Sequence, residues 1–319
     1  GGTKLTLAAA AGYGNSRTAF GKPITSFGLV KHKIGQMAIL TYVSESMVYR
    51  TAGMIDRNLA DVGTNDPETV LKRIEEYDAE CSMVKVWCAE MCDYVVDETV
   101  QIFGGAGFVE DYPAERYWRD ARVNRIYEGT SEINRLLVPG RLIRRAMKGE
   151  LPIFQKAMAL LDELTSGPSR EAPAEGFLAA EAAMLAGAKK VALMCLGTAV
   201  QRRGEALKDE QEVLGHFADI AMATYALESA LLRTRKRAAA RGEEATRLQE
   251  AAVRCYAQEA MDEIEASARK ILAAVEDGDT LRTLLAAVKR FAKREVCNTV
   301  ALRRQVADAA IEQVGYPLG

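Results

Sequence analysis

Apolar residues recur at spacings of three and four along most of the 319-residue chain, which is the period of an amphipathic α-helix. The clearest run follows Pro67 and contains Val70, Ile74, Tyr77, Cys81, Val84, Cys88, Met91 and Val95. This narrow stripe predicts one helix from Asp66 to Gly104 that packs antiparallel against a preceding helix over about residues 26–59. Alternating β-branched patterns are weak throughout, so we expect an all-α fold.

The same period predicts further helices at about 3–18, 131–147, 175–204, 208–241, 245–275 and 279–313. Pro139 lies inside the second of these and should kink or interrupt it. Proline, glycine, serine and glutamate gather between the two halves, around one short amphipathic segment at 153–164. We therefore predict a helical bundle over residues 1–148, a linker over 149–175 and a second helical bundle over 176–319.

Composition excludes several classes of protein. With 49% hydrophobic and 27% charged residues the chain is globular, and its net charge of −2 gives no general electrostatic case for nucleic acid. Two histidines provide poor support for a metal site or a Ser-His-Asp triad. The longest apolar stretch, 177–200, is interrupted by charged residues, so no membrane span is expected. The chain opens with Gly1-Gly2 and not with Met, and its helical pattern is present by Thr3, so we expect it to begin inside a larger protein.

The six cysteines form no C-x-x-C pair. Cys81, Cys88 and Cys92 are spaced seven and four apart on a predicted helix. We interpret them as small buried apolar residues of a protein in a reducing compartment.

The stretch 126–135 is the strongest candidate for chemistry. In it Glu128 lies between an aromatic residue, Tyr127, and Gly129, and Thr130 can cap the helix that follows. Unpaired N–H groups at such a helix start attract anions. Partial burial there would raise the pKa of a carboxylate and suit a general base, although a Glu before a Gly-Thr turn is also commonly a solvated loop residue.

Two other stretches are weaker alone. In 17–24, Arg17 can fork onto phosphate and Phe20 can cover a flat ring, but an arginine at a helix end is often only a partner of the helix dipole. In 101–108, the glycines after Gln101 either end a helix or let bare N–H groups approach a pyrophosphate. A helix precedes these glycines, so they do not form a Rossmann fingerprint.

In this order and spacing, the three stretches resemble the acyl-CoA dehydrogenase family. Its signatures R-x-x-F-G-K-P-I, Q-I-F-G-G-x-G-F and I-Y-E-G-T-S-E-I-x-R match 17–24, 101–108 and 126–135, within a similarity that runs from about residue 1 to 148. The very-long-chain branch is most similar, including its C-terminal helical extension. The resemblance implies an all-α chain whose first part is the family's C-terminal four-helix-bundle domain, followed by a second helical bundle.

The resemblance also implies a reaction. Glu128 matches the base that takes a proton from the acyl α-carbon while a hydride leaves the β-carbon for N5 of FAD, which gives the trans-2-enoyl-CoA. The substrate-binding positions are Tyr127 and Gly129. The FAD-contacting positions are Arg17, Phe20, Gln101, Gly105, Thr130 and Glu132, the last of which is Gln in many relatives. The resemblance places the contacts of Arg17 and Phe20 mainly on the FAD of a neighbouring subunit, so a homodimer is expected.

Other partners follow from the same resemblance. They are an acyl-CoA substrate, an electron-transfer flavoprotein as electron acceptor, and an anionic membrane surface met by basic helices near residues 233–241 and 289–304. Such basic clusters are also common on solvated helix faces. The expected location is the cytoplasm, or the inner membrane and mitochondrial matrix in a eukaryote. The family's N-terminal helical domain and central β-domain have no counterpart in this sequence, so we expect the chain to be inactive alone. A non-catalytic docking or assembly module and an acyl-CoA oxidase are the alternatives.

Overall fold

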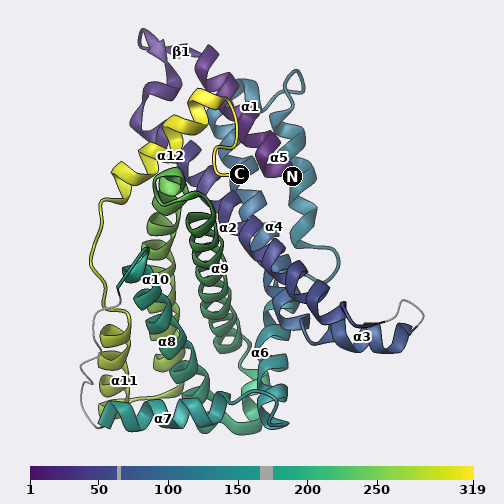
Figure 1. Ribbon diagram of the computed structural model, residues 1–319, viewed down its shortest axis with the longest axis vertical. Coiled ribbons are helices and arrows are strands. Elements are labelled where there is room, and N and C mark those ends of the chain that lie inside the picture. The colour runs from purple at the N-terminus through teal and green to yellow at the C-terminus, as the bar shows by residue number, and fades with distance from the viewer. Residues whose placement is uncertain (63–65, 166–174) are drawn as a thin grey trace.

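The computed structural model describes residues 1–62, 66–165 and 175–319, and is helical almost throughout (Figure 1). The helices of its N-terminal half are α1 (Gly2–Ser16), α2 (Gly28–Leu59), α3 (Pro67–Glu75), α4 (Asp78–Phe103), α5 (Ala114–Arg122) and α6 (Ser131–Met147). A two-stranded antiparallel hairpin, β1 (Thr18–Ala19) and β2 (Lys22–Pro23), separates α1 from α2. Short 3-10 turns occur at η1 (Ile24–Ser26), η2 (Gly104–Gly107) and η3 (Val123–Arg125).

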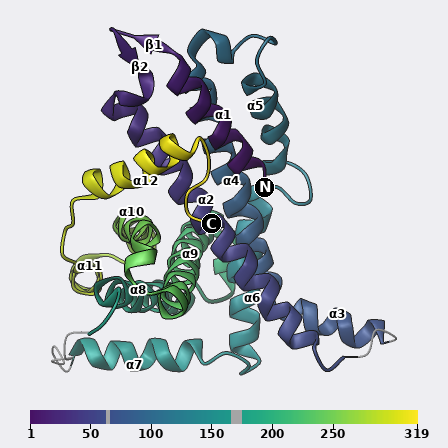
Figure 2. The same cartoon turned by 45° about the horizontal axis from the view of Figure 1, so that its top comes forward.

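The second half contains α7 (Ile153–Thr165), α8 (Ala179–Arg203), α9 (Gln211–Arg241), α10 (Arg247–Val275), α11 (Gly278–Phe291) and α12 (Thr299–Gln313), with turns η4 (Gly204–Asp209) and η5 (Glu244–Thr246). In Figure 1, α8, α9 and α10 stand side by side, α7 lies across one end of them, and α12 crosses near the other. Figure 2 shows the chain's first and last residues near each other beside α1 and α2.

The expected helix from Asp66 to Gly104 is two helices, so that prediction is wrong in its extent. Asp66 does cap α3, accepting a hydrogen bond from the Thr69 N–H at 3.1 Å, with Pro67 in the first turn. A break then separates α3 from α4, and Gly104 ends α4 with a positive φ of 60°. The core of α4 also differs from the predicted stripe, because its buried residues include Met83, Val86 and Trp87.

The last expected helix is also divided. The stretch 279–313 forms α11 and α12, joined by an irregular segment at 293–298. Arg294 in that segment donates hydrogen bonds to Glu265 and to the carbonyl of Ala292. The side chain of Asn298 then caps α12 through the N–H of Ala301 at 3.0 Å. The predicted interruption at Pro139 is also wrong, since α6 runs through it.

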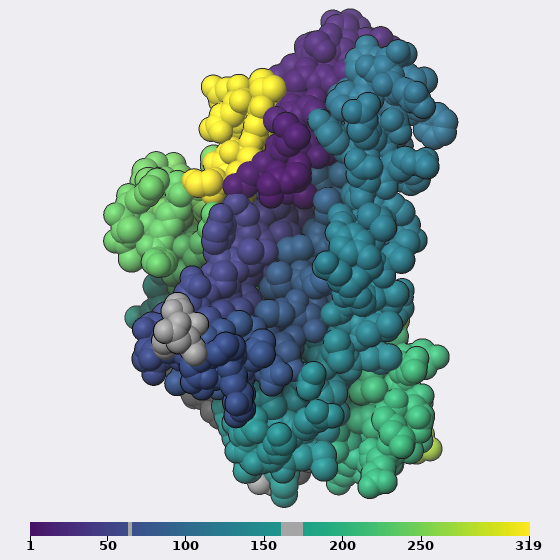
Figure 3. Space-filling model, turned by 90° about the vertical axis from the view of Figure 1, so that its right-hand side faces the viewer, coloured from purple at the N-terminus to yellow at the C-terminus, as the bar shows by residue number. Residues whose placement is uncertain are grey.

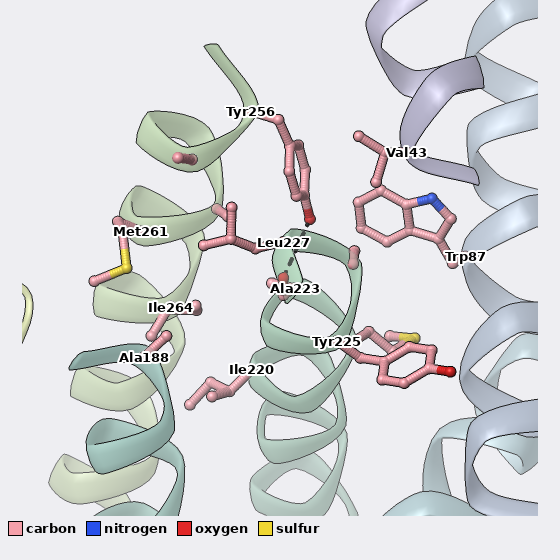
Figure 4. Close-up of a cluster of buried hydrophobic side chains, with 14 of the residues drawn as sticks. Val43, Trp87, Ala188, Ile220, Ala223, Tyr225, Leu227, Tyr256, Met261 and Ile264 are labelled. Atoms are coloured by element: carbon pink, nitrogen blue, oxygen red, sulfur yellow. Dashed lines mark hydrogen bonds between the residues drawn. The ribbon is translucent and has the colours of Figure 1, made fainter. Parts of the chain in front are cut away.

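The hydrophobic core continues across both halves of the chain. In Figure 4, Trp87 of α4 lies beside Val43 of α2 and close to Tyr256 of α10, with the Trp87 and Tyr256 rings edge to face at 5.5 Å. The buried Tyr42 hydroxyl and the Thr234 side chain of α9 are 2.7 Å apart, which satisfies both polar groups. Such packing fixes α9 and α10 against the helices that carry the candidate site, while the predicted domain boundaries stay a prediction.

Helix α8 is more apolar than its charged residues suggested. By length and composition alone, Ala179–Asp209 of the described chain could cross a membrane. However, 56% of its apolar window is buried inside the molecule, where α8 packs against α9 and α10. That burial is typical of a core helix. The predicted amphipathic segment is α7, and residues 166–174 of the predicted linker lie outside the described residues.

Candidate active site

The loop before α6 takes the form expected from its sequence. Thr130 is the N-cap of α6, and its hydroxyl accepts a hydrogen bond from the N–H of Ile133 at 3.3 Å. Glu128 and Gly129 both have left-handed backbones, with φ of 55° and 81°. Glycine adopts this conformation freely, whereas glutamate pays a steric cost, so the neighbouring structure must hold the turn.

Two side chains fix this turn through the carbonyl of Gly129. Lys85 of α4 donates a hydrogen bond to it at 2.5 Å, and the Asn134 amide of α6 donates another at 2.8 Å. Asn134 is 7% exposed and also bonds the Thr130 carbonyl at 3.2 Å. The backbone at Glu128 is therefore tied to both α4 and α6.

Glu128 lines a cleft of about 480 Å³ that opens on the face shown in Figure 3, where the purple start of α1 lies beside the blue and teal part of the chain. Its other walls come from the first turn of α1, from α2 and from α4; they include Lys4, Glu45 and Val84. Tyr127 also lines the cleft, and its hydroxyl donates a hydrogen bond to Asn124 at 2.6 Å.

Glu128 itself is exposed, so the partial burial expected for it is wrong in this structure. The left-handed turn places the residue at the rim of the cleft and not in the core.

The cysteines of α4 depart from the prediction in the same way. Cys81 is exposed, whereas Cys88 and Cys92 are half-buried and line the cleft. Burial raises the pKa of the Cys88 thiol to about 11, so it stays protonated at neutral pH. The face of α4 that carries Cys88 and Cys92 turns toward the cleft, because Val86 and Trp87 occupy the core side of the helix.

The remaining candidate residues lie at two places. Phe20 sits at the tip of the β1–β2 hairpin and is 95% exposed, with a positive φ of 51°. Arg17 is exposed at the end of α1, and Gln101 is exposed near the end of α4. The two helix ends lie together, because the rings of Tyr13 and Phe103 stack with centroids 4.1 Å apart.

Gly105 lies in η2, two residues after Phe103, and a side-chain carbon added there would meet no atom within 4 Å. The backbone at Gly105 is thus open to approach by a ligand. Glu132, in contrast, is exposed in the first turn of α6. Its pKa is lowered, chiefly by a hydrogen bond with Thr130.

The structure therefore brings Glu128, Tyr127 and Thr130 together, but sets Arg17 and Phe20 apart from them. Glu128 shares a cleft with the first turn of α1, while Arg17 follows its last turn. Fifteen residues of helix separate these two points, which is roughly 22 Å. A single chain therefore cannot bring both Glu128 and Phe20 into contact with the same small ring of a ligand.

Sequence reasoning missed Lys85, Asn134 and Glu45. Asn134 lies within the 126–135 stretch that matches the family signature, so the sequence could have marked it as a site residue. Lys85 and Glu45 lie 44 and 83 residues from the loop positions that they accompany, and no local pattern marks them.

The basic residues of the second half are largely engaged within the molecule. Arg303 is 5% exposed and donates to Gln36 at 2.9 Å, and Arg235 donates to the carbonyl of Phe177 at 3.1 Å. Arg233, Arg237 and Arg294 also have partners in the chain. These arginines therefore join different elements of the chain through hydrogen bonds and ion pairs.

Two family models match the chain, over residues 1–143 and 187–290, and both are described as "Acyl-CoA dehydrogenase, C-terminal domain". A probable acyl-CoA dehydrogenase from Bacillus subtilis (strain 168) is 43% identical over 99% of this chain. The chain belongs to the acyl-CoA dehydrogenase family. The crystal structure of an acyl-CoA dehydrogenase complexed with FAD from Bacillus anthracis is 42% identical and matches 98% of the chain with a TM-score of 0.95.

The chain spans about half the length of these relatives, 54% in each case. The mouse very long-chain specific acyl-CoA dehydrogenase is 36% identical, but only over 42% of this chain and 18% of its own length. Membership of the family thus rests on nearly the whole chain, whereas similarity to the mouse very long-chain specific enzyme rests on 42% of it.

Proposed function

We propose that this chain carries the catalytic base and part of the cofactor contacts of an FAD-dependent acyl-CoA dehydrogenase, which converts an acyl-CoA to the trans-2-enoyl-CoA. The observation that carries the proposal is the position of Glu128 at the rim of the cleft. Lys85 and Asn134 hold its turn in place through hydrogen bonds to the carbonyl of Gly129. A base must reach its proton at a defined position, and a tied backbone supplies that position.

The chain's residues fit FAD. The Bacillus anthracis relative is complexed with FAD. In this chain Phe20 offers an exposed ring at the hairpin tip, and Gly105 offers open backbone. The Ser131 hydroxyl is buried without a hydrogen-bond partner at the start of α6, beside Thr130, which suits a ligand or water there. When bound, FAD supplies the acceptor for the hydride from the substrate's β-carbon.

The chain's own part of the reaction is proton removal. The Glu128 carboxylate takes the proton from the α-carbon, which is weakly acidic because it adjoins a thioester. An acyl chain lying in the cleft displaces water from the carboxylate, and a drier carboxylate is a stronger base. Tyr127 and Gly129 flank the base in the chain, and Tyr127 also lines the cleft. In the proposal the thioester rests beside these two positions.

We also propose a homodimer. The roughly 22 Å along α1 keeps Phe20 away from the Glu128 cleft of its own chain. Phe20 is 95% exposed on a projecting hairpin, so its ring can contact a second subunit or the FAD that this subunit holds. An FAD that extends between two subunits would meet the base of one chain and the hairpin of the other.

Further parts of the proposal rest on similarity. The resemblance to the very-long-chain branch suggests three of them: long-chain acyl-CoA as substrate, a role in fatty acid β-oxidation, and an electron-transfer flavoprotein as electron acceptor. We also propose peripheral membrane association, in the cytoplasm or at an inner membrane. Many arginines of the second half are engaged within the molecule, so this proposal rests on α7, whose Met158 is 68% exposed. Sedimentation with anionic vesicles at low salt tests it, and absence of binding would exclude it.

Two alternatives are separated by one set of measurements. Intact mass and a visible spectrum are recorded on the purified protein, and palmitoyl-CoA is then added. A flavin band that bleaches supports a dehydrogenase, provided that air restores it slowly; rapid restoration by air indicates an acyl-CoA oxidase. A folded protein that takes up no flavin in any preparation supports a non-catalytic docking or assembly module.

A further inference from the structure

Three side chains from distant parts of the sequence meet at one carboxylate, that of Glu45, beside the cleft. Glu45 of α2 forms an ion pair with Lys4 of α1 and with Arg233 of α9, the latter at 3.2 Å. The Tyr316 hydroxyl, which follows α12, donates a hydrogen bond to the same carboxylate at 3.1 Å. The Lys4 ammonium also lies 4.5 Å from the centre of the Tyr316 ring. We call these four residues the Glu45 cluster.

The segment that carries Tyr316 is firmly anchored. Leu318 is fully buried, and its carbonyl accepts a hydrogen bond from Gln249 of α10 at 3.3 Å. Arg237 of α9 donates to the carbonyl of Gly319 at 2.9 Å. Burial raises the pKa of Tyr316, so its hydroxyl remains a donor. The second half of the chain thus presents two fixed groups, Arg233 and Tyr316, to Glu45.

The cluster also borders the candidate active site. Glu45 and Lys4 line the cleft that Glu128 lines. Burial alone would raise the pKa of Glu45, but Lys4, Arg233 and Tyr316 outweigh it and lower the pKa. Glu45 is therefore a fixed anion that ties the turn of α1 carrying Lys4 to α2 and α9.

We propose that Glu45 and Tyr316 are positioning residues for the reaction proposed above, on which this inference rests. They hold the first turn of α1 in place as a wall of the acyl cleft, so that the helices of the second half set how tightly the acyl group binds. Glu45 pairs with neighbouring side chains and takes no part in proton transfer. Its loss should therefore raise KM and leave kcat nearly unchanged, because a loosened wall costs ordering on binding.

The test compares three variants of the FAD-containing holoenzyme with palmitoyl-CoA as substrate. Glu45→Gln should raise KM about 10-fold and Tyr316→Phe about 3-fold, with kcat within about 2-fold in each. Asp308→Asn is the matched control, because it removes the Lys31–Asp308 ion pair, at 2.5 Å between α2 and α12, without touching the cleft. Its KM should stay at the wild-type value.

Hydrogen exchange at the amides of residues 6–10 gives a second readout that needs no turnover. Exchange there should be faster in Glu45→Gln and Tyr316→Phe than in Asp308→Asn. Wild-type KM and wild-type exchange in Tyr316→Phe would overturn the inference even if Glu45→Gln failed to fold. If Glu128→Gln abolished turnover in the same preparations, the proposed function would stand even though the inference about Glu45 and Tyr316 had failed. A fully active Glu128→Gln enzyme would refute the proposed function instead, and the inference with it.

Discussion

Replacing Arg135 by methionine should lower the free energy of unfolding by about 3 kcal/mol. Arg135 of α6 donates two hydrogen bonds to Glu90 of α4, at 2.5 and 2.8 Å, and one to Asp219 of α9 at 2.8 Å. Its side chain is 22% exposed, and those of its partners are 27% and 23% exposed. Hydrogen bonds to charged groups contribute about 1.5–3 kcal/mol each, and this partial exposure reduces the sum by roughly half.

Urea unfolding followed by far-ultraviolet circular dichroism measures this loss, with the slope of the transition compared between variants. Arg141→Met in the same helix is the control, because Arg141 forms one ion pair, with Asp78 at 2.8 Å, and is 42% exposed. We expect it to cost at most about 1 kcal/mol. A loss below about 1 kcal/mol for Arg135→Met would refute the reasoning that this arginine joins three helices.

Three further predictions concern other parts of the chain. Gly35→Ala should destabilise the fold by about 1–3 kcal/mol in urea unfolding, because the added carbon would lie 2.6 Å from the carbonyl oxygen of Arg303. Gly53→Ala in the same helix meets nothing within 4 Å and should stabilise by up to about 1 kcal/mol; equal effects would contradict the argument. Phe20→Ala should change stability by less than about 0.5 kcal/mol yet weaken FAD retention on gel filtration, since the ring is 95% exposed. Because the pKa of Glu45 is lowered from 4.5 in the folded state, its contribution is complete above that pH and is lost as the pH falls through the lower value, so Glu45→Gln should flatten the fall in stability on acidification.

The helical class and many helix bounds could be predicted because their signals are local. Helix α6 begins after Thr130 and ends at Met147 as expected, since the cap and the apolar period lie within the helix itself. The segment 293–298 contains no glycine or proline to mark it, and Arg294 there bonds to Glu265 of α10. Its break is set by tertiary contacts that no local pattern records.

The candidate site likewise has features that the local sequence predicts and features that only the fold determines. Glu128 and its turn could be predicted because Gly129 and Thr130 have clear local preferences. The exposure of Glu128 could not, because it depends on which face of α4 and which turn of α1 border the cleft. Lys85 and Glu45 come from other helices, so only the fold shows that they serve this site.

The measurement that tests the central claim most directly is single-turnover bleaching of the flavin by palmitoyl-CoA without oxygen, in wild type, Glu128→Gln and Glu110→Gln. Glu110 is an exposed carboxylate in the irregular segment between η2 and α5 and serves as the chemical control. We predict a loss in rate of roughly 10²–10⁴-fold for Glu128→Gln, with FAD still bound, and a wild-type rate for Glu110→Gln. Bleaching of Glu128→Gln at the wild-type rate would contradict the assignment of Glu128 as the base.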